Sequence, residues 1–271
     1  MTEELGPGSI YNQLPNLTNF VLQFLDKRAF CQAKTKDFKG EVEDEDGEEF
    51  QDEEEQEEED DEDDEEDLDH DEIILGNTTD VIIAMARALG DQFLEYFTKI
   101  GPSLVRYLDD SHPASDKVMV IGCLAETFNN CRAAITVYFN DFLQIVLKNS
   151  KTDNSSMNRN CAYAIGILAE HSGVLLGQHL EVALQALTEM HQKSEEQDAK
   201  DNVVAATCRI AQNYSSQVPF DTLVQSVLTQ IPLTEDLNEN ETVLKFVFNI
   251  FSQSNPNRLN IHPLTFLSYS S

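Results

Sequence analysis

Apolar residues recur every three to four positions through most of the chain, which is the spacing of one face of an α-helix. Strict alternation of apolar and polar residues, which would predict strands, is almost missing. Gly and Pro separate the periodic windows, as they commonly separate helices. The pattern therefore predicts an all-α chain, with helices over residues 14–37, 77–89, 93–108, 115–130, 134–148, 155–172, 176–193, 195–214, 220–230 and 239–253.

One helical pattern occurs three times. The stretches DKVMVIGCLAE (116–126), NCAYAIGILAE (160–170) and NVVAATCRIAQ (202–212) align without gaps, at offsets of 44 and 42 residues. These offsets fall within the roughly 40 to 47 residues of HEAT and armadillo repeats. The shared positions are small or aliphatic, and small residues let neighbouring helices approach closely. The sequence therefore predicts a stack of helix pairs.

The acidic residues are concentrated in one segment. Residues 41–72 hold 25 of the 50 Asp and Glu residues and no Lys or Arg, whereas the rest of the chain carries 25 acids against 18 basic residues. Like charges at i, i+4 oppose helix formation, so we predict a disordered acidic loop here. No basic stripe is present elsewhere, and we expect no direct nucleic-acid partner.

Such a segment suits multivalent contact with Lys and Arg side chains. Its field reaches only about 8 Å in physiological salt, so a basic partner would have to come close. The alternative is a solvated loop that only keeps the protein soluble. Under the first interpretation, the candidate contacts are Glu53, Glu54, Glu55, Glu57, Glu58, Glu59, Asp60, Asp61, Glu62, Asp63, Asp64, Glu65 and Glu66.

The sequence offers no constellation for catalysis. Phosphate-binding loops, nucleophile elbows and zinc-protease motifs are absent, and the six His residues lack metal-ligand spacing. Glu170 beside His171 could suggest an acid–base pair, but adjacent helical residues diverge by about 100°. The residues that correspond to His171 in the other copies are Thr127 and Asn213. We therefore predict a protein that is not an enzyme and needs no cofactor or metal.

The five cysteines are typical of reduced core residues, because four of them lie within apolar helical patterns and none has metal-binding spacing. No secretory signal opens the sequence, and no apolar run approaches membrane-spanning length. We expect a protein of the cytoplasm or nucleus without a membrane partner.

Three stretches carry a resemblance to a known family. RNCAYAIGILAEHSG (159–173), DNVVAATCRIAQ (201–212) and IPLTEDLNENETVLKFVFNIFSQSNP (231–256) resemble the importin-β (karyopherin-β) nuclear transport receptors. The resemblance implies an α-solenoid, or superhelix, of about five HEAT repeats. It corresponds to the carboxy-terminal half of such a receptor, so we expect a fragment of a longer protein. The implied organisation is a first HEAT A helix (1–40), the acidic disordered loop (41–72), a HEAT-repeat array (73–256) and a divergent or truncated tail (257–271).

The resemblance also implies roles for particular elements. An outer A helix and an inner B helix form each repeat, which pairs 14–37 with 77–89, 134–148 with 155–172, 176–193 with 195–214, and 220–230 with 239–253. Inner helices face cargo, so their candidate contacts are Asp116, Glu126, Asn160, Glu170 and Asn202. The alternative for these five residues is helix capping and hydrogen bonding between repeats.

The resemblance finally implies partners. We expect basic cargo such as histones or ribosomal proteins, carried by a monomer that shuttles between cytoplasm and nucleus through the nuclear pore. Ran-GTP and nucleoporins would bind regions of a full-length receptor that this chain does not contain. The alternative function is an acidic HEAT-repeat histone chaperone or protein-interaction scaffold without transport activity.

Overall fold

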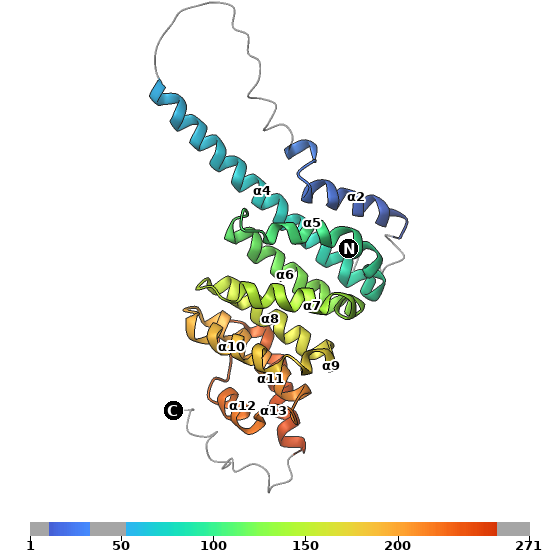
Figure 1. Cartoon of the computed structure of the whole chain (residues 1–271), viewed down its shortest axis with the longest axis vertical. Coiled ribbons are helices and arrows are strands. Elements are labelled where there is room, and N and C mark those ends of the chain that lie inside the picture. Colours follow the sequence, from blue (N-terminus) through green and yellow to red (C-terminus); the bar gives the residue numbers. More distant parts are fainter. Residues whose placement is uncertain (1–10, 33–52, 254–271) are drawn as a thin grey trace, which may run out of the picture. The chain divides into compact units, whose positions relative to one another are not determined.

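The computed structural model describes residues 11–32 and 53–253, with the backbone alone over 53–69. Every regular element in these ranges is an α- or 3-10 helix, which confirms the all-α prediction. The chain divides into two compact units, Met1–Asn149 and Ser150–Ser271. The helices are labelled in Figure 1.

The main elements in the described part of the first unit are α-helices joined by short 3-10 turns. Its helices are α2 (Leu14–Leu25), α4 (Glu53–Leu89), α5 (Leu94–Val105), α6 (Ala114–Asn130) and α7 (Arg132–Asn149), and its 3-10 turns are Tyr11–Gln13, Gly90–Phe93 and Arg106–Leu108. The inner helices α4 and α6 lie against each other, and α2 packs on both α4 and α5. Ile82, Phe93 and Ile100 are fully buried between them.

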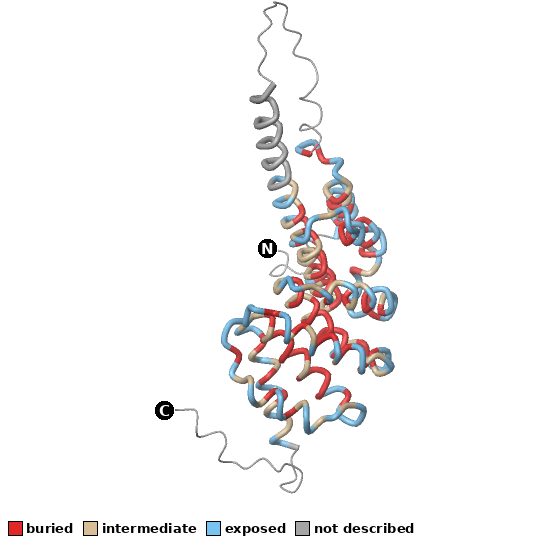
Figure 2. The backbone as a smooth tube through the Cα atoms, turned by 60° about the vertical axis from the view of Figure 1, so that its left-hand side comes forward, coloured by how far each residue is buried: buried red, intermediate tan, exposed pale blue. Residues whose placement is uncertain are grey.

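The second unit repeats this arrangement. It contains α8 (Ser155–His171), α9 (Val174–Gly177), α10 (Leu180–Lys193), α11 (Gln197–Asn213), α12 (Phe220–Leu228) and α13 (Asn240–Gln253), with a 3-10 turn at Leu237–Glu239. Helix α11 is its centre, because it packs against α8, α10, α12 and α13. Figure 2 shows buried residues concentrated along the helices inside each unit. The inner helices therefore stack on one another, as in HEAT repeats.

Close approach of α8 and α11 explains the small residues of the repeated motif. A Cβ atom placed on Gly166 would lie 3.1 Å from Arg209 Nη1 and 3.3 Å from the Ala206 Cα atom. Such contacts are tighter than van der Waals distance, so a larger residue would push the two helices apart. The prediction that small residues mark the stacking face is confirmed at this position.

The predicted helix pairs within each unit are found. Helix α2 packs on α4 and α10 packs on α11. Helices α12 and α13 share a buried cluster in which the Phe220 and Phe246 rings lie 6.4 Å apart. The pairing of 134–148 with 155–172 joins the two units and stays a prediction.

Two predicted boundaries at the start of the chain differ from the structure. The opening helix ends at Leu25 instead of continuing to residue 37, because Lys27 has a φ of +52°, outside the helical region. Residues 33–37 lie outside the described ranges. Helix α4 begins at Glu53, so residues 53–72 of the predicted disordered loop are helical, while 41–52 also lie outside. Glu is a good helix former, and the packed end of α4 supplies the helical nucleus that a free segment lacks.

One helical stretch of the described residues, His70–Leu108, is long and apolar enough to cross a membrane by length and composition alone. Gly90 breaks it, with a φ of +56° that an L side chain rarely adopts. Ile82, Met85 and Phe93 within it are buried in the first unit. These apolar side chains of the stretch therefore pack in the core of the first unit.

Candidate functional site

Asp116, a predicted cargo contact, lies in the first turn of α6 and is 9% exposed. Its Oδ2 atom is 3.4 Å from Nδ1 of His112, and the His112 ring lies 4.6 Å from the ring of Tyr107. The carboxylate therefore faces the end of its own repeat. An acid in the first helical turn also complements the helix dipole.

The two predicted Asn contacts are likewise engaged. Asn202 in α11 is 3% exposed, and its Nδ2 atom donates to Oδ2 of Asp236 at 2.8 Å and to the Asp198 carbonyl at 3.0 Å. Asn160 in α8 is half-buried and also has a partner. The Asn202 side chain therefore joins α11 to the loop that precedes α13.

Glu126 and Glu170 each pair with an arginine of the neighbouring inner helix. Arg87 Nη2 lies 3.0 Å from Glu126 Oε2, and Arg209 Nε lies 3.1 Å from Glu170 Oε2. The Glu126 and Glu170 side chains remain 27% and 47% exposed. These geometries support the alternative, hydrogen bonding between repeats, while contact with cargo stays a prediction.

Arg209 is a residue that the sequence interpretation missed. Its side chain is 10% exposed and its Nη2 atom lies 3.0 Å from both Glu239 Oε2 and Thr242 Oγ1, in addition to the Glu170 contact. The guanidinium also lies 5.8 Å from the centroid of the Tyr163 ring. The available signal was a charge at a position that the other two copies of the motif fill with Cys123 and Ile167. Arg209 therefore joins α8, α11 and α13.

Asp201 is a second missed residue. It is fully buried, and its Oδ2 atom accepts hydrogen bonds from the backbone N–H groups of Thr234, Glu235 and Asp236 at 2.9–3.1 Å. Gln197 donates to the other oxygen at 2.8 Å. Three backbone donors satisfy a buried carboxylate well, so Asp201 fixes the loop between α12 and α13.

The acidic end of α4 holds the other predicted contacts. Glu53–Glu66 lie on one continuous helix with the packed residues up to Leu89, and Figure 1 shows this end extending beyond the helices that α4 packs on. Among the residues of α4 whose side chains are described, the first side-chain contacts are those of Asp71, which accepts from Lys27 Nζ at 2.6 Å and from Gln32 Nε2 at 3.3 Å. We call residues 53–70 the acidic arm.

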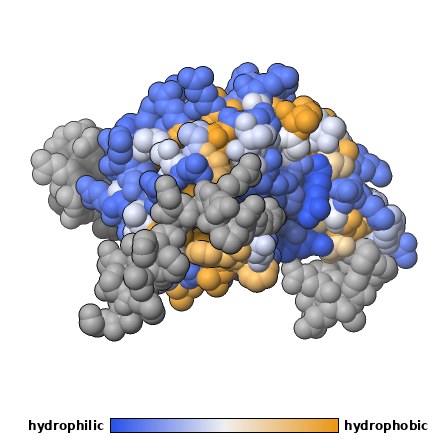
Figure 3. All heavy atoms as spheres, turned by 90° about the horizontal axis from the view of Figure 1, so that it is seen from below, coloured by the Kyte–Doolittle hydropathy of each residue, from blue (hydrophilic) through white to orange (hydrophobic). Residues whose placement is uncertain are grey.

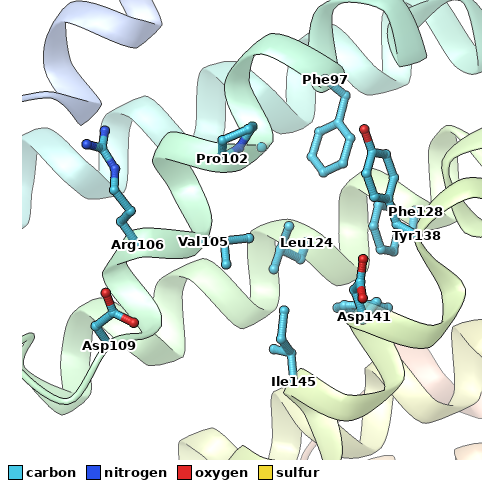
Figure 4. Close-up of a pocket in the computed structure, with 12 residues that line it drawn as sticks. Phe97, Pro102, Val105, Arg106, Asp109, Leu124, Phe128, Tyr138, Asp141 and Ile145 are labelled. Atoms are coloured by element: carbon cyan, nitrogen blue, oxygen red, sulfur yellow. The ribbon is translucent and has the colours of Figure 1, made fainter.

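An apolar groove of about 370 Å³ lies between α5 and α7 of the first unit, above α6. Phe97, Pro102, Phe128 and Tyr138 line one end, with Arg106, Asp109 and Asp141 at its margins (Figure 4). Its aromatic walls and polar rim suit one apolar side chain of a partner. Nothing in the sequence pattern separated these residues from ordinary core.

A polar groove of about 740 Å³ lies in the second unit, where α8, α11 and α13 begin. Glu196, Asp198, Glu235 and Asp236 line it together with Arg159. Arg159 Nη1 lies 2.9 Å from Asp198 Oδ2, which neutralises one of the acids. The positive ends of the helix dipoles offset the others further.

Apolar side chains are exposed on the last described helix. Leu244, Phe248 and Phe251 of α13 are 66%, 69% and 50% exposed. Figure 3, which views the molecule from below Figure 1, shows hydrophobic patches among hydrophilic residues on that face.

The buried thiols of Cys123, Cys161 and Cys208 are poorly suited to chemistry. Burial raises the pKa of Cys123 and of Cys208 to about 12, and raises that of Cys161 as well. Such thiols stay protonated near neutral pH, whereas nucleophilic and metal-binding cysteines react as thiolates. Among the described residues, no three His, Cys, Asp or Glu side chains gather as they would around a metal ion.

Comparison with known proteins gives consistent matches. Residues 22–110 match the family "Importin repeat 6". The chain is 25% identical over 240 residues to "Probable importin subunit beta-4" of Schizosaccharomyces pombe, an alignment that covers 89% of this chain and 21% of that protein. It is 28% identical over 192 residues to human "Importin-4", covering 70% of this chain and 18% of that protein.

The chain therefore spans about a fifth of the length of these relatives. The 240-residue match is long enough to reach into both structural units, and it includes the acidic arm and the repeated motif. Together with the stacked helix pairs, these matches make the chain similar to proteins of the importin-β family, which its sequence motifs also resemble.

Proposed function

We propose that this chain is part of a nuclear transport receptor of the importin-4 type, which carries basic cargo into the nucleus. The observation that carries the proposal is the similarity to two proteins named as importins, over 89% and 70% of the chain. The stacked inner helices support it, because HEAT arrays provide extended surfaces for protein partners. A receptor of this kind works by binding and needs no catalytic residue.

The charge of the chain supports basic cargo. Residues 41–72 carry half of all the acids and no compensating base. Many weak contacts with Lys and Arg of histones or ribosomal proteins would together give a useful affinity. Once the first contact holds the two proteins together, each further contact forms within the same complex at a high effective concentration. Such contacts weaken with salt.

The structure changes which residues we expect to dominate cargo binding. Asp116 and Asn202 are buried, and Glu126 and Glu170 already pair with arginines. A cargo cation at either Glu would have to share the carboxylate with its arginine or displace it. We therefore assign the main role to the acidic residues listed between Glu53 and Glu66, and a secondary one to the five inner-helix residues.

The remaining parts of the proposal concern the longer protein. We propose that Ran-GTP binding releases the cargo, that nucleoporins guide the receptor through the pore, and that it shuttles as a monomer between cytoplasm and nucleus. Both partners would bind largely outside this chain, which spans about a fifth of its relatives.

A pull-down with the full-length gene product tests transport. Immobilised Ran loaded with a non-hydrolysable GTP analogue, and immobilised nucleoporin repeats, should each retain the protein, with GDP-loaded Ran as the control. Retention of histones without retention by either partner would contradict the transport proposal and favour an acidic histone chaperone.

A second experiment tests the acidic segment. Residues 41–72 are replaced by a Gly-Ser linker of equal length, and affinity for a histone tail is measured at two salt concentrations. The control keeps the length but changes every Asp and Glu of 41–72 to Asn or Gln. Both variants should lose affinity and most of its salt dependence. Unchanged affinity in both would leave the segment as a solubility device.

A further inference from the structure

Helix α4 has two halves of different character. From Leu75 onward it is anchored in the first unit, where Leu75, Ile82 and Ala86 are buried and Thr78 and Thr79 are buried with their hydroxyls on carbonyl oxygens of the same helix. Residues 53–72 hold 17 Asp and Glu among 20 positions and no Lys or Arg. The structure nevertheless forms one continuous helix from Glu53 to Leu89.

The boundary between the halves is a defined contact. Lys27 and Gln32, in the segment that follows α2, both hold the Asp71 carboxylate. Tyr107 also lies near Asp71, and its hydroxyl donates to the Leu25 carbonyl at 2.9 Å. Two residues further on, Ile73 is still 63% exposed. Among the residues of α4 whose side chains are described, side-chain contacts with other elements therefore begin at Asp71.

Opposing effects act on the arm. The packed half supplies a nucleus, so lengthening the helix avoids the unfavourable first turn. Glu has a high helix propensity, and acids near a helix N-terminus complement the dipole. Against this, acids repeat at i, i+4 along nearly the whole arm, and each like-charge pair disfavours the helix. The charge on the carboxylates decides between the two states.

We propose that the acidic arm is a charge-gated extension of α4. It is helical when its carboxylates are neutralised, by protons or by a Lys- and Arg-rich segment of a partner, and it unwinds back to the Asp71 contact when they are fully charged. The partner half of this inference rests on the proposed function, whereas the proton half does not. A basic partner would then be recognised by helix formation along the arm, with no preformed pocket.

Carbon-13 Cα chemical shifts of residues 53–70 in the whole chain measure the state directly. At pH 7 and low salt we expect coil values for the arm and helical values for residues 75–89. Addition of a synthetic Lys-rich peptide should move the arm shifts to helical values, at least a tenfold change in the helix-to-coil ratio. A Gly-Ser peptide of equal length should have no effect.

A neutral variant tests the effect of charge at pH 7, without an acidic solution that could unfold the whole chain. Every Asp and Glu of 53–69 is changed to Asn or Gln, and its arm should be helical at pH 7 without peptide and should not respond to it. Adding Glu62→Pro to this variant should remove that helix beyond the substitution and leave residues 75–89 unchanged, since Pro breaks a helix interior.

The outcomes separate the two halves of the inference. Identical arm shifts in the wild type and the neutral variant at pH 7 would overturn the charge gate. If the neutral variant is helical but the wild-type arm shifts do not change with the Lys-rich peptide, the charge dependence would stand and the basic partner would be ruled out. If the arm responds to charge as proposed but the full-length protein is retained by neither Ran nor nucleoporin repeats, only the proposed function would be contradicted.

Discussion

Replacing Arg209 by Met gives the sharpest test of how the inner helices are held together. The side chain is 10% exposed and pairs with Glu239, whose own side chain is 8% exposed. Arg209→Met leaves that carboxylate buried without a cation, and it leaves Thr242 without its donor. Breaking a buried ion pair by removing one partner destabilises by about 3–5 kcal/mol. We therefore expect a loss of that size in the second unit.

A surface pair provides the matched control. Arg87 and Glu126 join α4 to α6 with the same 39-residue separation as Glu170 and Arg209, but their side chains are 48% and 27% exposed. Exposed ion pairs contribute about 0–1 kcal/mol. Arg87→Met should therefore change the free energy of unfolding by no more than that.

Urea denaturation followed by circular dichroism measures these free energies, and hydrogen exchange of α8, α11 and α13 amides assigns the loss to the second unit. The double variant Arg209→Met, Glu239→Met should recover more than half of the loss, because it removes the stranded charge. A loss below about 1 kcal/mol in Arg209→Met, or a double variant as unstable as the sum of both changes, would refute the reasoning.

Three further predictions concern a buried carboxylate, an ion-paired carboxylate and the cysteines. Asp201→Ala should destabilise by about 3 kcal/mol by leaving three backbone donors unpaired, and amide exchange of residues 233–239 should rise first; unchanged exchange would contradict this role. Burial alone would raise the pKa of Asp26, but hydrogen bonds from Ser103, Arg28 and Arg106 lower it below its ordinary value. Its contribution is therefore present above about pH 4 and is lost as pH falls through the depressed pKa, so the stability difference between wild type and Asp26→Asn should vanish there; a constant difference would be inconsistent. Finally, a disulfide reagent at pH 8 should modify the exposed Cys31 fastest in the native chain, and Cys31→Ser should remove that phase, whereas equal rates at Cys161 and Cys208 would argue against their burial.

Local patterns in the sequence were enough to predict the fold class and the repeat. Helical periodicity and the 44- and 42-residue offsets depend only on which residues recur, and the stacked helices α4, α6, α8 and α11 confirm them within their units. The end of the opening helix was not predictable in this way. It is set at Lys27, whose φ of +52° and contact with Asp71 involve a residue 44 positions away.

The candidate contacts show the same division. Glu126 and Glu170 were recognised as corresponding residues, and two roles were open to them from the sequence. Only the structure shows an arginine of the neighbouring inner helix beside each one. Arg209 and Asp201 were missed altogether, since an isolated charge within an apolar helix gives no indication of its partner.

The sequence alone determined the helical class, the repeat length and the place of the negative charge, because these depend on residues close together along the chain. Tertiary structure decided which polar residues are already paired and where the opening helix ends. Those properties depend on partners 30 to 44 residues away along the chain, such as Glu239 for Arg209 and Asp71 for Lys27. A side chain becomes buried only when the helices pack together, and burial sets the free-energy cost of leaving its charge unpaired.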